Sequence, residues 1–177
     1  MIMPRGQQQL LMPASPWFIW GSLVLAMSLH MLINMGWAGR AVWVPDVLAL
    51  VLVFWIIHQP LRVGVGVAFV LGLAMDVHQS SLLGQHALAY TALSFFALGV
   101  HRRLIGFSVP SQAAQVLPFF VAAHALSLMV RLLAGGDFPG WGMVAAPLLE
   151  TLLWPLVSVL LLMPQKRPPD PDANRPL

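Results

Sequence analysis

Six apolar runs, separated by short connections rich in glycine, proline and polar residues, constrain this chain more than any other feature. The runs are continuous rather than alternating, which favours helices over the strands of a barrel. Soluble domains carry roughly 25% charged residues, whereas this chain carries 8%. The sequence therefore predicts an all-α polytopic membrane protein with six transmembrane helices, at about 17–35, 41–57, 63–77, 85–100, 112–134 and 141–163.

The third and fourth runs leave a second arrangement open. A helix needs ~20 apolar residues to cross a bilayer, and the third run is short and ends in a polar turn. These two runs could instead form a partly re-entrant hairpin beside four full spans. In either case we expect a transmembrane domain at 17–163, a short cytoplasmic tail at 1–16 and a disordered, proline-rich cytoplasmic tail at 164–177.

The basic residues indicate an orientation. Six spans place both tails on one side, and seven of the nine basic residues then share that side: Arg5, Arg62, Arg102, Arg103, Lys166, Arg167 and Arg175. The other side receives Arg40 and Arg131. Cytoplasmic loops are enriched in Lys and Arg, so we expect cytoplasmic termini. The formal charge of +3 is thus interpreted as an orientation signal, and no nucleic-acid partner is expected.

The stretch 64–90 contains a face of small residues that ends in a charge. Gly64, Ala68, Gly72 and Asp76 lie four residues apart, so a helix places them on one face. In lipid, such a face lets another helix backbone approach closely. It could dock a partner helix or, as we favour, pack inside the bundle. Asp76 ends its helix at the outer edge, where we expect a shaped rim available to a partner.

Other polar residues lie within the predicted spans. A charge at the bilayer centre costs at least ~2.5–3.5 kcal/mol. Glu150 lies roughly 15 Å below the start of its helix, at about 1.5 Å per residue, and we expect it to be protonated or hydrogen-bonded in the bundle. Asp46 follows Pro45, a pair that favours a helix start slightly over a binding site. His30 and His124 are interpreted as satisfied bundle histidines rather than ligands.

Motifs for catalysis or metal binding are absent from the sequence. The chain has no cysteine, which excludes disulfides and thiolate chemistry. HExxH, GxSxG and phosphate-binding glycine motifs do not occur. Asp76 with His78 or His86 would make an acid–base pair, but one carboxylate beside two loop histidines is too common a pattern to indicate catalysis. We expect no enzymatic activity, no cofactor and no metal.

Four stretches, in their order and spacing, resemble the bacterial rod shape-determining MreD family. They are VPDVLALVLVFW at 44–55, GLAMD at 72–76, SSLLGQHALAY at 80–90 and LLWP at 152–155. Pro60 follows the first of these stretches, and Glu150 precedes the last. The resemblance covers nearly the whole chain.

The family's characteristic residues can be located in this sequence. Its proline-aspartate pair falls on Pro45 and Asp46. The glycine-aspartate turn and the turn histidine fall on Gly72, Asp76, Gly84 and His86. Ser80 stands where the family often has a glycine, so the turn after Asp76 departs from the family pattern.

The resemblance implies a non-enzymatic inner-membrane component of the machinery that elongates rod-shaped bacteria. The implied partners are the scaffold protein MreC, the actin-like filament protein MreB, and the membrane glycan polymerase and transpeptidase of lateral peptidoglycan synthesis. The resemblance also implies a fold similar to the substrate-binding subunits of energy-coupling-factor vitamin transporters.

Two functions from different classes follow. The first is a scaffold that docks partner helices, for which the partner-binding or structural candidates are Pro45, Asp46, Gly64, Ala68, Gly72, Asp76, Gly84, His86, Arg131 and Glu150. The second is a small-solute-binding subunit or transporter with an outer cavity lined by His30, Asn34, Asp46, Asp76 and Arg131. A side-chain-filled interior at that depth would exclude the second. For Arg131 itself, the favoured interpretation is that its side chain extends to the outer interface. We favour the scaffold because the chain shows no inverted repeat.

Overall fold

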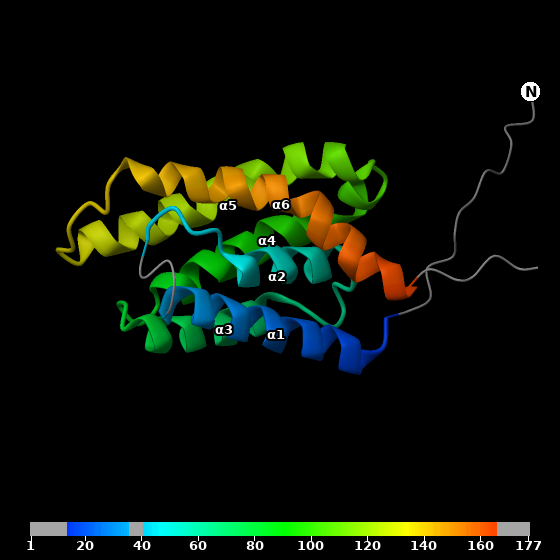
Figure 1. The fold of residues 1–177 in the computed structure, drawn as a ribbon, viewed down its shortest axis with the longest axis horizontal. Coiled ribbons are helices and arrows are strands. Elements are labelled where there is room, and N and C mark those ends of the chain that lie inside the picture. The colour runs from blue at the N-terminus through cyan, green and yellow to red at the C-terminus, as the bar shows by residue number, and fades with distance from the viewer. Residues whose placement is uncertain (1–13, 36–40, 166–177) are drawn as a thin grey trace, which may run out of the picture.

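Six α-helices form one bundle in the computed structural model, which describes residues 14–35 and 41–165 (Figure 1). The helices are α1 (Pro16–Met35), α2 (Val47–His58), α3 (Val65–Gln79), α4 (Gln85–Ile105), α5 (Val109–Leu133) and α6 (Ala145–Leu162). Two short 3-10 turns, Trp141–Val144 and Met163–Gln165, flank α6. The predicted all-α class and the six helices are therefore confirmed for the described residues.

Three of these segments are long and apolar enough to cross a membrane: Pro16–Met35, Val109–Leu133 and Trp141–Gln165. By contrast, α2 has 12 residues and α3 has 15. A helix of 12 residues rises about 18 Å, which is shorter than the ~30 Å hydrocarbon core. The protein is thus a helical membrane protein in which two of the six helices are shorter than a full span.

The two ends of the bundle differ. We call the end where α1 begins and α6 finishes the tail end, and Figure 1 shows both of these helix termini at that same end. At the opposite end α1 finishes, α2 begins, α3 turns into α4, and α5 connects to α6. The predicted tails at 1–16 and 164–177 lie largely outside the described residues.

Helix α2 is the centre of the core. Every residue from 48 to 57 is buried, and α2 packs against α1, α4 and α6. The helix begins at Val47, whereas we predicted a run from residue 41. Residues 41–46 are not helical because Pro45 disfavours helical geometry at Val44. Asp46 then caps the helix, and its Oδ1 accepts a hydrogen bond of 2.9 Å from the Ala49 N–H.

Other helix ends also differ from the predicted runs. Helix α4 continues to Ile105, past the apolar run, because its basic residues Arg102 and Arg103 suit the last turn of a helix. The sixth run begins with a 3-10 turn, and α6 itself starts at Ala145.

The face of small residues on α3 packs inside the bundle. Ala68 and Gly72 are buried, and α3 makes its most extensive contact with α4. A Cβ on Gly72 would overlap the Ala87 backbone and would lie 2.8 Å from the His86 carbonyl carbon. Gly64 caps the start of α3 and is only partly buried. The internal-packing hypothesis is confirmed for this face, and the alternative that it docks a partner is wrong at Ala68 and Gly72.

Candidate binding cavity

Asp76 is enclosed by the hairpin of α3 and α4. Its side chain is 1% exposed. Oδ1 accepts hydrogen bonds from the Ser81 hydroxyl at 3.0 Å and from the His86 N–H at 2.7 Å. Oδ2 accepts from the Gly84 N–H at 2.8 Å and the Ala87 N–H at 3.3 Å. The predicted outer rim, with Asp76 available to a partner, is therefore wrong for this residue.

The imidazole of His86 completes the Asp76 site. Its Nδ1 lies 2.8 Å from Asp76 Oδ1, and both side chains are largely or fully buried. Gly84, which caps the start of α4, has φ of 105°, a left-handed conformation that suits glycine. This backbone turn directs the N–H groups of Gly84, His86 and Ala87 at the carboxylate. The site thus organises the hairpin, as expected of a structural residue.

Ser80, where the resemblance predicts a glycine, has an unusual backbone conformation. It caps the end of α3 with φ of 51°, in the left-handed region that glycine occupies most easily. Glycine would adopt this backbone conformation readily, whereas serine adopts it here at some cost.

A second buried network joins α2, α4, α5 and α6. Glu150 is fully buried, and its Oε1 accepts from the Asp46 N–H at 2.9 Å and lies 2.7 Å from His124 Nε2. Asp46 Oδ2 accepts from the Tyr90 hydroxyl, and Asp46 Oδ1 lies 3.9 Å from His30 Nδ1. The prediction that Glu150 is hydrogen-bonded within the bundle is confirmed.

This second network is incomplete. Glu150 Oε2, His30 Nδ1 and Asn34 Nδ2 are buried atoms without a hydrogen-bond partner among the residues that the structure describes. Buried polar atoms are nearly always paired with protein or with ordered water. The three atoms thus mark places where a water molecule or a ligand group belongs.

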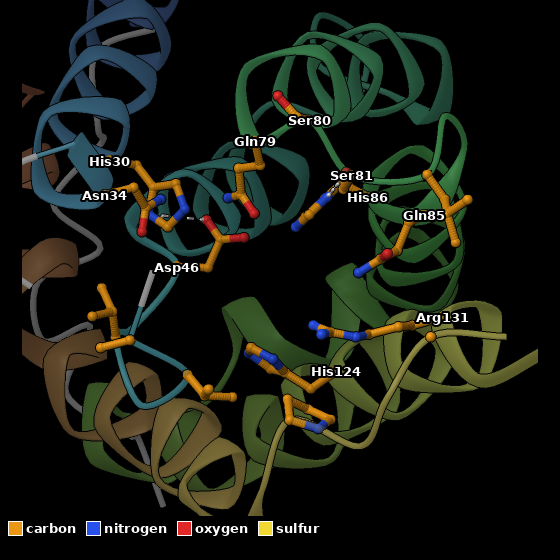
Figure 2. Close-up of a pocket in the computed structure, with 16 residues that line it drawn as sticks. His30, Asn34, Asp46, Gln79, Ser80, Ser81, Gln85, His86, His124 and Arg131 are labelled. Carbon is orange, nitrogen blue, oxygen red and sulfur yellow. Dashed lines mark hydrogen bonds and ion pairs between the residues drawn. The ribbon is translucent and has the colours of Figure 1, made fainter. Parts of the chain in front are cut away.

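A cavity of about 630 Å³ lies beside this network, at the end opposite the tail end. Figure 2 shows polar side chains converging on it from α1, α3, α4 and α5 and from the segment before α2. Its polar lining consists of His30, Asn34, Asp46, Gln79, Ser80, Ser81, Gln85, His86, His124 and Arg131. Ligand sites commonly measure about 300–1,000 Å³, so the volume is that of a binding site.

A smaller cavity of about 50 Å³ extends toward Glu150. It shares Asp46, His86 and His124 with the larger cavity. A water molecule occupies about 30 Å³ of liquid. The smaller cavity, which Glu150 lines, is therefore large enough for a water molecule.

The structure brings together four of the five residues predicted to line an outer cavity. His30, Asn34, Asp46 and Arg131 line it, whereas Asp76 does not, because the hairpin encloses it. The histidine interpretation fits His124, which pairs with Glu150, but His30 keeps an unpartnered ring nitrogen.

Three further residues of this region, Gln79, Gln85 and Tyr90, were not predicted from the sequence. Gln79 and Gln85 line the cavity, and the Gln85 amide donates to the Ser127 hydroxyl at 2.9 Å. Tyr90 was also missed, although it is the single tyrosine of the chain and lies in an apolar run, which is a usable signal. Among the described residues no group of three or more His, Asp or Glu side chains is placed to hold a metal ion.

Comparisons with known proteins agree on one family. A family model described as rod shape-determining protein MreD matches residues 13–163. The chain is also similar to a rod shape-determining protein MreD of Haemophilus influenzae, with 30% identity over 117 residues. That alignment covers 66% of this chain and 72% of the relative. No solved structure gives a significant match.

Proposed function

The chain belongs to the rod shape-determining protein MreD family, and from this premise we propose that it acts as a non-enzymatic scaffold of the bacterial elongation machinery. Its role in cell shape follows from the family. In the proposal, it docks MreC and, directly or through MreC, the filament protein MreB and the glycan polymerase and transpeptidase of lateral wall synthesis. The match over residues 13–163 is the observation that carries the proposal.

Large apolar side chains on the bundle exterior support docking in the membrane. Leu25 on α1, Phe95 on α4 and Leu152 on α6 are each about two-thirds exposed or more, at 69%, 67% and 74%. They lie on three different helices, so they can report on three faces of the bundle. Lipid covers such side chains wherever a partner helix does not.

Site-specific crosslinking tests the docking proposal. A photoreactive residue at position 25, 95 or 152 is introduced into the full chain, which is then co-purified in detergent with MreC. We expect crosslinks to MreC from one of these faces and none from the buried control position 68. An absence of MreC from the purified complex, together with no crosslink from any exposed position, would contradict the scaffold function.

The proposed location is the inner membrane, with both tails in the cytoplasm. The asymmetry of seven basic residues against two supports this orientation. The natural absence of cysteine makes it directly testable, because single cysteines can be placed at will. In intact cells with a permeable outer membrane, a membrane-impermeant maleimide should label the exposed Asp137→Cys, next to the cavity-lining Gly136, and leave Ser108→Cys unlabelled. The reverse pattern would invert the proposed topology.

A second candidate function is a small-solute-binding membrane subunit or transporter. The cavity of about 630 Å³ with its polar lining favours it, since a side-chain-filled interior would have excluded it. The proposed similarity in fold to the substrate-binding subunits of energy-coupling-factor transporters belongs to this second candidate. Uptake of labelled solute into vesicles that contain the protein would distinguish transport from scaffolding.

A further inference from the structure

Arg131 places a positive charge on one wall of the cavity. Figure 2 shows its side chain pointing from α5 into the cavity, with Asp46 on the other side. Within the part of the chain that the structure describes, no carboxylate lies within ion-pair distance of its guanidinium. A guanidinium offers five N–H donors in a planar fork that fits phosphate or carboxylate oxygens. This wall is therefore suited to an oxyanion.

The other wall carries acceptors and buried atoms that lack a partner. The Asp46 side chain retains 12% exposure, so its carboxylate is reachable from the cavity. His30 is 95% buried, since it is 5% exposed, yet its Nδ1 has no hydrogen-bond partner within residues 14–35 and 41–165. The Nδ2 of Asn34 is likewise unpartnered. An ammonium group could donate to both Asp46 and a neutral His30 ring, because it has three N–H donors.

Exposed aromatic residues lie next in sequence to residues that line the cavity. Trp43 lies between the lining residues Val42 and Val44, and Phe138 precedes the lining residue Pro139. Trp43, Phe138 and Trp141 are all exposed, and the last two form an edge-to-face pair with centroids 5.6 Å apart. Exposed tryptophans of membrane proteins gather at the depth of the lipid headgroups. The mouth is therefore expected at that depth.

We propose that this cavity binds a small zwitterionic group, with its oxyanion at Arg131 and its ammonium at Asp46 and His30. A charge on each wall selects such a group over a simple anion, because a simple anion would face the Asp46 carboxylate. The same chemistry occurs in the headgroup of an ethanolamine phospholipid and in a free phosphoethanolamine-like solute. The inference deepens the second candidate function by naming a ligand class, and it does not depend on docking of MreC.

The test uses the purified, delipidated full chain in detergent and three probes. Two are zwitterionic: dioctanoyl phosphatidylethanolamine and water-soluble phosphoethanolamine. The third, propyl phosphate, replaces the ammonium of phosphoethanolamine by a methyl group and keeps its shape. Calorimetric titration should show saturable binding of at least one zwitterionic probe. Binding of phosphoethanolamine assigns a free solute, whereas binding of the lipid alone assigns a headgroup, and both results support the inference.

Matched comparisons define what would overturn it. Where phosphoethanolamine binds, it should exceed propyl phosphate in affinity by about tenfold or more. For the lipid, dioctanoyl phosphatidylglycerol, which lacks the ammonium, gives the same comparison. Arg131→Gln should reduce affinity by about tenfold or more, whereas Arg102→Gln, an exposed arginine near the far end of α4, should leave it unchanged.

Three results would overturn the inference: no saturable binding of either zwitterion, no preference for the ammonium, or equal effects of the two arginine substitutions. Thermal unfolding of both variants confirms that they remain folded. MreC co-purification on the same preparations separates failure of this inference from failure of the scaffold function.

Discussion

Asp76 and Glu150 are both buried carboxylates, yet they are satisfied in different ways. Every partner of Asp76 lies within 11 residues along the chain, and both of its oxygens accept hydrogen bonds. Glu150 accepts from a residue 104 positions away, and its second oxygen has no partner. The first carboxylate stabilises a hairpin, whereas the second lies beside a cavity that can receive water or ligand.

This difference teaches how to separate structural from binding residues in such a bundle. Burial alone does not separate them, because both carboxylates are almost fully inaccessible. The useful distinction is whether each polar atom already has a partner. A complete set of partners indicates a structural role, and an incomplete set next to a cavity indicates a place for a ligand.

Gly72→Leu should give the largest effect, because it acts on the hairpin directly. A side chain at residue 72 would collide with the backbone of Ala87, which cannot rotate away as a side chain can. We expect the destabilisation to exceed about 3 kcal/mol, beyond the usual cost of overpacking, with little folded protein recovered from membranes. Size-exclusion chromatography and thermal unfolding in detergent measure the effect.

Gly66→Leu is the matched control for that substitution. It lies on the same helix, and a Cβ there meets no atom within 4 Å. A change of about 1 kcal/mol or less is expected, because glycine is itself unfavourable in a helix. Equal behaviour of the two variants would show that the close approach of α3 and α4 is not required for folding.

Asp76→Asn should be strongly destabilising even though it conserves shape. All groups that contact the carboxylate can act as donors, so an amide NH₂ in place of either oxygen would face N–H groups. Leaving buried donors unpaired costs about 1–3 kcal/mol each. We expect a loss of about 2–4 kcal/mol on that basis, measured by thermal unfolding with the exposed Asp137→Asn as the control.

Glu150→Gln should be tolerated better than Asp76→Asn. The glutamine can place its amide NH₂ at the Oε2 position, which has no protein partner, and can keep its oxygen toward Asp46 and His124. We expect a loss of about 1 kcal/mol, the scale of one weakened hydrogen bond. Parallel unfolding curves for these two amide variants test the comparison, and an equal loss would remove the distinction between the complete and incomplete sites.

Ser80→Gly should give the smallest effect, and it should stabilise the protein. Glycine removes the strain of the left-handed conformation at φ of 51° but loses more entropy on folding. The net gain is expected to be about 0.5 kcal/mol. Ser81→Gly is the control and should instead lower the stability, because it removes the hydroxyl that donates to Asp76. A lower unfolding temperature for Ser80→Gly would contradict the conformational explanation.

Much of the fold was predictable because apolar runs directly specify membrane helices. The six helices, the burial of the α3 face and the internal bonding of Glu150 all follow from local patterns and from the cost of polar groups in lipid. The start of α2 at Val47, rather than at residue 41, could have been predicted, because Pro45 and Asp46 together are typical of a helix start.

The candidate cavity was predictable only as a set of residues at similar depth. The position of a residue along its predicted helix gives its depth in the membrane. On that basis four residues at similar depth, His30, Asn34, Asp46 and Arg131, were predicted to line a cavity. Neighbours across the bundle do not follow from it: Tyr90 and Asp46 are 44 positions apart, and His124 and Glu150 are 26 apart. Asp76 was misassigned for the same reason, because its enclosure depends on a turn whose backbone N–H groups leave no signature in the sequence.

The local closure of the Asp76 site has a consequence for how the chain enters the membrane. All of its O–H and backbone N–H donors lie within residues 81–87, so α3 and the start of α4 can enclose the carboxylate before the later helices have been made. The Asp46 N–H, by contrast, finds its acceptor on Glu150, 104 positions later in the chain. The hairpin can thus form early, whereas the hydrogen bond donated by the Asp46 N–H is completed only when α6 has been made.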